Sequence, residues 1–238
     1  MKPSTITCLL IMLLTSGPTP FSARSQDQQA AIPSSGADAA KAKAEVGSEE
    51  KAAAWVAALK LDDSAKETRV TKVIATHLKT IRDRHNEHPY TTVPAGNNPV
   101  TGKPLSQLDR QMIANSAMPK NVHEALMTGL RKDLSPEQVE AVLDKYTVGK
   151  VAFTLKGYHA IVPDLTAEEE QTILGFLKQA REEAVDYKNM NQISAIFEIY
   201  KTKSEQYLNA NGRDWKKLYK AYSAAAKAKK AEAAKPGQ

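Results

Sequence analysis

The sequence predicts an all-α protein, a single domain of about six to eight helices behind a disordered N-terminal tether. One pattern recurs along the chain: a leucine, then a helix-capping residue, then a helix-forming run. The runs that follow carry apolar residues at intervals of three and four. No stretch alternates convincingly with the period of two that is typical of a strand. These observations favour helices packed on helices.

Residues 1–25 have the pattern of a signal peptide. Lys2 gives a basic start, residues 6–14 form a short apolar core, and residues 23–25 place small residues at the two positions that a signal peptidase reads. Cys8 is the one cysteine and lies inside that core, so the mature chain would have no disulfide to stabilise it. We therefore expect an exported protein, periplasmic or secreted.

Charge and hydropathy weigh against two classes of partner. The formal net charge is +6, and it falls by two when Lys2 and Arg24 leave with the signal. Part of the remaining excess lies in the Ala/Lys-rich tail, residues 227–238, where it favours solvation over nucleic-acid binding. No run of about 20 apolar residues follows the signal, so we expect no transmembrane segment.

The chain divides into a linker, a folded domain and a tail. Residues 26–47 contain few large apolar side chains, so we expect a flexible linker that cannot repay the entropy of ordering. The helical domain is expected over residues 48–226, before the tail. Inside it, residues 89–104 carry several prolines and two glycines, which predicts a long irregular loop. Such a loop is either a binding or lid element or a mobile connection.

Capping sequences predict where the helices begin. Ser135 and Thr166 can each accept a hydrogen bond from the amide three residues on, and Gln138 and Glu169 can return one. Pro136 suits a first turn, where its missing N–H costs nothing. The apolar faces expected to pack are Val70, Val73, Ile74, His77 and Ile81; Ile173, Leu177, Ala180 and Ala184; Ile193, Ile196, Phe197, Tyr200 and Tyr207; and Trp215, Leu218, Tyr219 and Tyr222.

A first candidate site lies in residues 77–88. His77, His85 and His88 fall on one stripe that continues an apolar helix face. His85 and His88 are one turn apart and could share a metal, but His77 lies about 16 Å from His88 along the axis, so the three cannot form one site. We favour hydrogen-bonded histidines at a helix end over a metal site.

A second candidate site surrounds Gly149, which interrupts the helical pattern. Tyr146 and Lys150 flank this turn, which could open into a cleft, and Tyr158 follows close behind. Of the 14 aromatic residues, 11 come after Lys145, as a ring-lined pocket for a sugar or peptide would need. A core without cysteines would need the same residues, and core packing is the interpretation we favour, with the polar tips of the tyrosines as exceptions.

Catalytic signatures are missing from the sequence. It contains no Gly-x-Ser-x-Gly elbow, no glycine-rich phosphate loop, no His-Glu-x-x-His motif and no cysteine nucleophile after the signal. The paired carboxylates at 62–63, 168–170 and 182–183 suit first turns or solvated faces. An enzyme would have to use scattered residues, so we name no catalytic residue and no cofactor.

Several stretches together resemble the domain-of-unknown-function family 3826. They are residues 81–88, 134–149, 163–170, 180–186 and 207–214. The resemblance covers most of residues 52–222 and implies an exported bacterial helical protein, for which a sugar-binding role has been suggested. It supplies no catalytic residues, and Arg84 stands where the family motif would have an aromatic residue. A looser resemblance, to periplasmic chaperones of the Spy and CpxP type, rests on a Leu-Thr-x-x-Gln motif that any capping box would also contain.

The sequence thus leads to the hypothesis of an accessory module that binds a carbohydrate or cell-envelope glycan in a cleft between helices. The expected ligand-binding residues are Arg82, Asp83, His85 and Asn86 on one wall and Tyr146, Lys150 and Tyr158 on the other. The alternatives are a Spy/CpxP-like chaperone or stress-response protein and a hydrolase that depends on His85 and His88. The leading hypothesis requires the two walls to meet across one hollow.

Overall fold

The computed structural model describes residues 35–99 and 101–233, and all regular structure in these ranges is helical. They contain nine α-helices and one short 3₁₀ helix, slightly more than the six to eight helices predicted. None of the helices in these ranges is long and apolar enough to cross a bilayer. The predicted signal peptide, residues 1–25, lies outside the described residues, so export stays an expectation.

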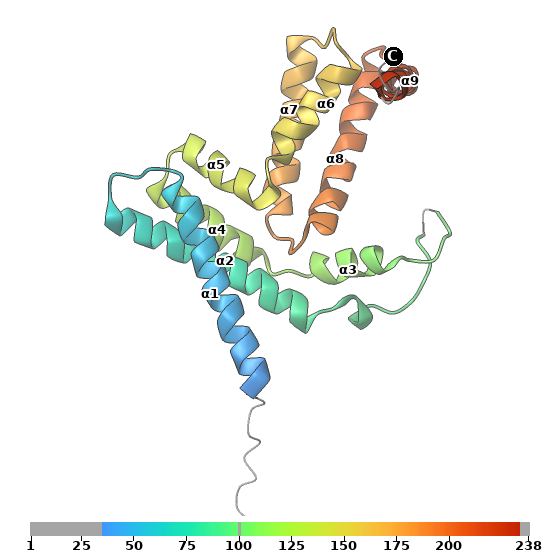
Figure 1. Ribbon diagram of the computed structural model, residues 1–238. Helices are drawn as coiled ribbons and strands as arrows, with labels where there is room; N and C mark the ends of the chain where they lie inside the picture. The colour runs from blue at the N-terminus through green and yellow to red at the C-terminus, as the bar shows by residue number, and fades with distance from the viewer. Residues whose placement is uncertain (1–34, 100, 234–238) are drawn as a thin grey trace, which may run out of the picture.

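Four helices enclose a first hydrophobic core (Figure 1). They are α1 (Ser35–Ala57), α2 (Ser64–Glu87), α4 (Lys120–Asp133) and α5 (Pro136–Thr147). Val70 and Ile74 of the predicted α2 face are fully buried there, together with Leu130 of α4. Asp63 caps α2 by accepting a hydrogen bond from the Lys66 amide at 3.0 Å. The apolar periodicity of this half of the chain therefore marks its core.

The first helix begins inside the segment that we expected to be a flexible linker. α1 starts at Ser35, so residues 35–47 are helical in the structure, while residues 26–34 lie outside the described residues. The scarcity of large apolar side chains led to the expectation of a linker, but this segment is rich in alanine, the strongest helix former. Contacts with α2 begin near Glu45, whose carboxylate pairs with Lys79 at 3.2 Å.

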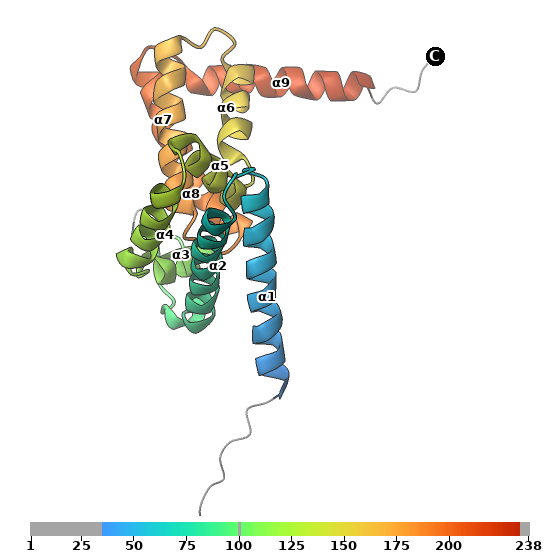
Figure 2. The same ribbon diagram turned by 90° about the vertical axis from the view of Figure 1, so that its left-hand side faces the viewer.

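A second core lies between the helices of the C-terminal half. These helices are α6 (Lys150–Ile161), α7 (Ala167–Ala184), α8 (Met190–Ala210) and α9 (Trp215–Ala233). Figure 1 shows α6, α7 and α8 side by side, and Figure 2 shows α9 crossing their end and projecting outward. Ile173, Leu177 and Phe197 are almost completely buried between them. The exposed last turns of α9 include the first part of the predicted Ala/Lys-rich tail.

The capping boxes predicted for α5 and α7 are confirmed. The Gln138 amide donates to the Ser135 hydroxyl at 3.3 Å, and the Glu169 amide donates to the Thr166 hydroxyl at 3.2 Å. The break at Gly149 is also present, because this residue and the preceding Val148 both adopt left-handed backbone conformations. This turn redirects the chain from the first core to the second.

The predicted irregular loop connects α2 to α3 (Gln107–Ser116), and its described residues contain the short helix Tyr90–Thr92 and an isolated antiparallel bridge between Asn97 and Pro104. Its first part is tied to α3. The Arg110 guanidinium donates to the Val93 carbonyl at 2.8 Å, and the Gln111 side chain accepts a hydrogen bond from the Tyr90 amide at 2.9 Å. These hydrogen bonds attach the first part of the loop to α3. That the loop acts as a lid stays a prediction.

Candidate functional site

The structure does not bring the seven predicted ligand-binding residues to one cavity. Arg82 and Tyr146 share a small hollow of about 210 Å³ between α1, α2, α5 and the start of α8. Lys150 and Tyr158 line a different cleft, between α6, α8 and α9. The chain turns at Gly149, so that Tyr146 before this turn packs on the first core and Tyr158 after it packs on the second.

The wall predicted on α2 is engaged in protein contacts. Asp83 accepts hydrogen bonds from Lys79 at 2.7 Å and from Arg82 at 3.0 Å. Burial alone would raise the pKa of the Asp83 carboxyl, but these two cations hold that pKa below its usual value. The Arg82 guanidinium also donates to the Ser48 hydroxyl at 3.3 Å, which joins α2 to α1.

His85 and Asn86 face protein groups. His85 is buried, and its Nε2 atom has no hydrogen-bond partner in the described part of the chain. The carbonyl oxygen of the Asn86 side chain accepts a hydrogen bond from the Lys188 ammonium at 2.7 Å. The expectation of hydrogen-bonded histidines therefore fails for His85, while His77 has two partners, Tyr146 and Asp186.

We predict that His85 makes the protein sensitive to acid. Burial first, and the charge of Lys188 second, lower the pKa of His85 to about 4. The unfolded chain binds this proton near pH 6.5, so stability is lost as pH falls from about 6.5 to 4. Replacing His85→Gln should remove this loss. Between pH 7 and pH 4, the free energy of unfolding of the variant should therefore rise by about 1–3 kcal/mol relative to that of the wild type.

Urea denaturation across this pH range measures the effect of His85 on the free energy of unfolding. The matched control is His159→Gln, because His159 is exposed on α6. A difference between His85→Gln and the wild type that stays constant from pH 7 to pH 4 would contradict the prediction.

A buried polar network that the sequence analysis missed explains the position of Tyr146. The Tyr146 hydroxyl lies 3.1 Å from His77 Nδ1, and His77 Nε2 lies 2.9 Å from Asp186 Oδ1. The other carboxylate oxygen of Asp186 lies 2.9 Å from His123 Nδ1. Burial strongly raises the pKa of Tyr146, so its phenol stays neutral. The polar tip of Tyr146 thus points into the protein, and this residue connects α5 to α2.

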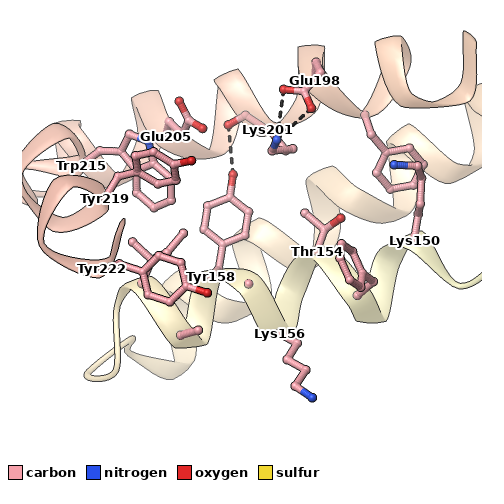
Figure 3. Close-up of a pocket in the computed structure, with 15 residues that line it drawn as sticks. Lys150, Thr154, Lys156, Tyr158, Glu198, Lys201, Glu205, Trp215, Tyr219 and Tyr222 are labelled. Carbon is pink, nitrogen blue, oxygen red and sulfur yellow. Dashed lines mark hydrogen bonds and ion pairs between the residues drawn. The ribbon is translucent and has the colours of Figure 1, made fainter. Parts of the chain in front are cut away.

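A ring-lined cleft of about 780 Å³ lies between α6, α8 and α9, and we call it the aromatic cleft. In Figure 3, Trp215, Tyr219 and Tyr222 gather at one end and Lys150 lies at the other. Trp215 stacks on Tyr219 with ring centroids 6.1 Å apart and lies 5.3 Å from the ring of Tyr158. These contacts form a connected aromatic surface.

Several rings of the aromatic cleft are open to solvent. Phe153 is 78% exposed, Tyr219 53% and Tyr222 40%, while Trp215 is partly buried against the second core. Large exposed rings that cluster on one side of a protein are typical of a binding surface, because rings that serve only to pack the core are buried. The ring of Tyr158 is buried, and its hydroxyl donates to the Lys201 carbonyl at 3.2 Å.

Polar groups lie beside these rings. Glu198 forms an ion pair with Lys201 at 2.8 Å, and the Lys150 ammonium lies 5.3 Å from the centroid of the Phe197 ring. Burial raises the pKa of the Glu205 carboxyl above its ordinary value. The cleft therefore offers carboxylate acceptors and ammonium donors at the edge of an apolar surface.

Ion pairs attach the start of α9, the helix that carries three of these rings, to the N-terminal end of α7. Arg213 donates to Glu169 at 2.9 Å and to Asp164 at 2.8 Å, which joins the start of α9 to the N-terminal end of α7. The hydrogen bond with Arg213 lowers the pKa of Glu169 to about 2. The Trp215 amide also donates to the side chain of Asn209 at 3.0 Å.

Sequence reasoning found part of the aromatic cleft. It identified Lys150 and Tyr158 as ligand-binding candidates, and both line the cleft. Trp215, Tyr219 and Tyr222 were assigned to the docking face of a last helix. Their spacing of four and three residues was the available signal, but it cannot distinguish a buried helix face from an exposed one. Only Trp215 of these three packs against the second core.

Within the described ranges, no group of three or more His, Cys, Asp or Glu side chains could hold a metal ion. The hydrolase that we considered on His85 and His88 therefore stays a hypothesis without a metal centre to support it.

Comparison with known proteins identifies a family that the chain matches. The sequence pattern of the family described as "Protein of unknown function (DUF3826)" matches residues 46–228. No curated protein matches the chain. The matched region includes both hydrophobic cores and the whole aromatic cleft.

Proposed function

Because the chain belongs to the DUF3826 family, whose description assigns no activity, we propose a function from the site itself: the protein binds a carbohydrate in the aromatic cleft. The observation that carries this proposal is the set of exposed rings along a cleft of about 780 Å³. This volume lies inside the range of about 300–1,000 Å³ that small-molecule sites occupy.

The chemistry of a sugar suits this surface. A pyranose ring presents C–H groups on its faces, and these pack against the electron-rich face of an aromatic ring. Its hydroxyl groups point outward from the edge, where they can donate to Glu198 and Glu205 and accept from Lys201. Tyr219 and Tyr222 are the rings best exposed for stacking at the α9 end. The combination supports a polyhydroxylated ligand over a purely apolar one.

The proposal includes export to a periplasm or to the exterior. Its support is the N-terminal pattern of residues 1–25. A module placed there would meet cell-envelope glycans or external polysaccharides, which makes these the first ligands to screen.

Replacing Tyr219→Ala or Tyr222→Ala should weaken glycan binding about tenfold, because each change removes one stacking surface. Thermal-shift screening of the wild type identifies the ligand, since a glycan at 100 times its Kd should stabilise the protein by about 2.7 kcal/mol. Calorimetric titration then compares the variants. The matched control is Tyr200→Ala, which removes a tyrosine of α8 that lies outside the cleft.

The same experiments identify the alternatives. A glycan that binds all three variants equally would remove the aromatic cleft from consideration. Release of reducing ends from a bound glycan would indicate hydrolysis. If no glycan shifts the melting temperature and the protein suppresses aggregation of a client protein, the chaperone alternative is favoured instead.

A further inference from the structure

A second cavity of about 780 Å³ lies between α1, α5 and the start of α8, and we call it the basic groove. Its lining includes Lys51, Trp55, Lys145, Gly149, Lys188 and Asn189. The small hollow that contains Arg82 adjoins it, because both cavities are lined by Lys51, Trp55, Tyr146, Lys188 and Ile193. The two cavities together form one surface at the junction of the two cores.

The charge of the basic groove is unbalanced. Lys51, Lys145 and Lys188 line it, and none of the three forms an ion pair with any residue that the structure describes. The one carboxylate in the lining, Asp144, already accepts a hydrogen bond from Arg181 at 2.7 Å. Lys188 has a neutral partner, Asn86. Three positive charges are thus left without a counter-charge from the protein.

The surroundings of these lysines favour an organic anion. The Lys51 ammonium lies 4.9 Å from the centroid of the Trp55 ring, and Trp55 is itself held by an edge contact with Tyr146 at 4.8 Å. The groove therefore joins ammonium groups to an immobilised ring. The first turn of α8, which begins at Met190 in the lining, adds positive potential to that of the lysines.

The basic groove and the aromatic cleft are neighbours along the same helix and the same turn. Gly149 lines the groove and the next residue, Lys150, lines the cleft. On α8, Ile193 lines the groove and Phe197, one turn later, lines the cleft. The two cavities therefore adjoin at the turn before α6 and along the first two turns of α8.

We propose that the basic groove binds the acidic groups of the glycan held in the aromatic cleft, so that the ligand is an acidic polysaccharide. This inference rests on the proposed carbohydrate-binding function. Lysine ammonium groups act as point charges for carboxylate, sulfate or phosphate. The shared chemistry is an anionic substituent on a sugar ring.

The test compares oligosaccharides that differ in charge. Oligogalacturonate carries carboxylates, a sulfated galactan oligosaccharide carries sulfates, and a cello-oligosaccharide of similar length is neutral. We expect one of the acidic probes to bind about tenfold more tightly than the neutral one at low salt, and this advantage to disappear in 0.5 M NaCl, where the screening length is only about 4 Å. The probe that binds identifies the anion.

The triple variant Lys51→Gln, Lys145→Gln and Lys188→Gln should bind the acidic probe as weakly as the neutral one. The matched control, Lys227→Gln, Lys229→Gln and Lys230→Gln, removes the same charge from the exposed end of α9 and should retain the preference. Circular dichroism verifies that both variants are folded.

The outcomes separate the two proposals. Equal affinity for acidic and neutral probes, with no effect of the groove variant, would overturn the inference and leave the carbohydrate-binding function standing. A loss of the preference in the α9 control as well would also overturn it, because net charge alone would then explain the preference. If no oligosaccharide binds the wild type, both proposals fail.

Discussion

Replacing Asp186→Ala is expected to destabilise the protein by about 3–5 kcal/mol, because it leaves two histidines without their shared anion. His77 is only 3% exposed and has its Nε2 atom 2.9 Å from the Asp186 carboxylate. His123 lies 2.9 Å from the other oxygen. These contacts join α2 and α4 to the segment between α7 and α8. The substitution should therefore destabilise the packing of both cores.

The pH dependence of stability should show that the charge of Asp186 causes this loss of stability. Burial alone would raise the pKa of the Asp186 carboxyl, but hydrogen bonds with His123 and His77 hold it below its usual value. The same hydrogen bond raises the pKa of His123. The Asp186 contribution is present above about pH 4 and lost as pH falls through its folded pKa, while the His123 contribution is present below about pH 6.5 and lost as pH rises through its folded pKa.

Urea denaturation of the wild type, Asp186→Ala and Asp186→Asn at several pH values measures these terms. The amide of Asp186→Asn keeps the shape of the side chain without its charge. The stability difference between the wild type and Asp186→Asn should therefore be largest between about pH 4 and pH 6.5. If Asp186→Ala lowers the free energy of unfolding by less than about 1 kcal/mol, the cost of one ordinary hydrogen bond, the network does not contribute strongly to the stability of the fold.

Much of the helical architecture could be predicted from the sequence because helix ends are local. The side chains of Ser135 and Gln138, and those of Thr166 and Glu169, pair with each other's backbone within one turn, so two residues three positions apart decide where a helix begins. The start of α1 could not be predicted in the same way. A segment with few large apolar residues can still be helical when it is rich in alanine.

The candidate site depended on packing between segments far apart in the chain, and only part of it could be predicted. Aromatic enrichment after Lys145 was compatible with a ring-lined pocket and with core packing, the interpretation we favoured, and it could not show that Tyr146 points back to His77 while Tyr158 faces α8. The direction of each ring depends on the reversal at Gly149. The exposure of Tyr219 could not be predicted for a related reason, since a helical stripe of rings predicts burial.

Replacing Gly129→Ala on α4 should destabilise the protein although alanine is the better helix former. A Cβ atom at this position would lie 2.7 Å and 2.8 Å from the two methyl carbons of Val73 on α2. Such overpacking costs about 1–3 kcal/mol, whereas the gain in helix propensity is about 1 kcal/mol. Val73 is β-branched and has few alternative rotamers, so the helices must separate. We expect a net loss of up to about 2 kcal/mol in the free energy of unfolding.

A double-mutant cycle tests whether this close helix approach is the cause. Val73→Ala alone leaves a small cavity, but Gly129→Ala in the Val73→Ala background should be neutral or stabilising, which corresponds to a favourable coupling of about 1–3 kcal/mol. The matched control is Gly175→Ala inside α7, where a Cβ atom meets nothing within 4 Å. That change should stabilise the protein by about 0.5–1 kcal/mol. Independent, additive effects of Gly129→Ala and Val73→Ala would show that α2 and α4 can separate freely at this crossing.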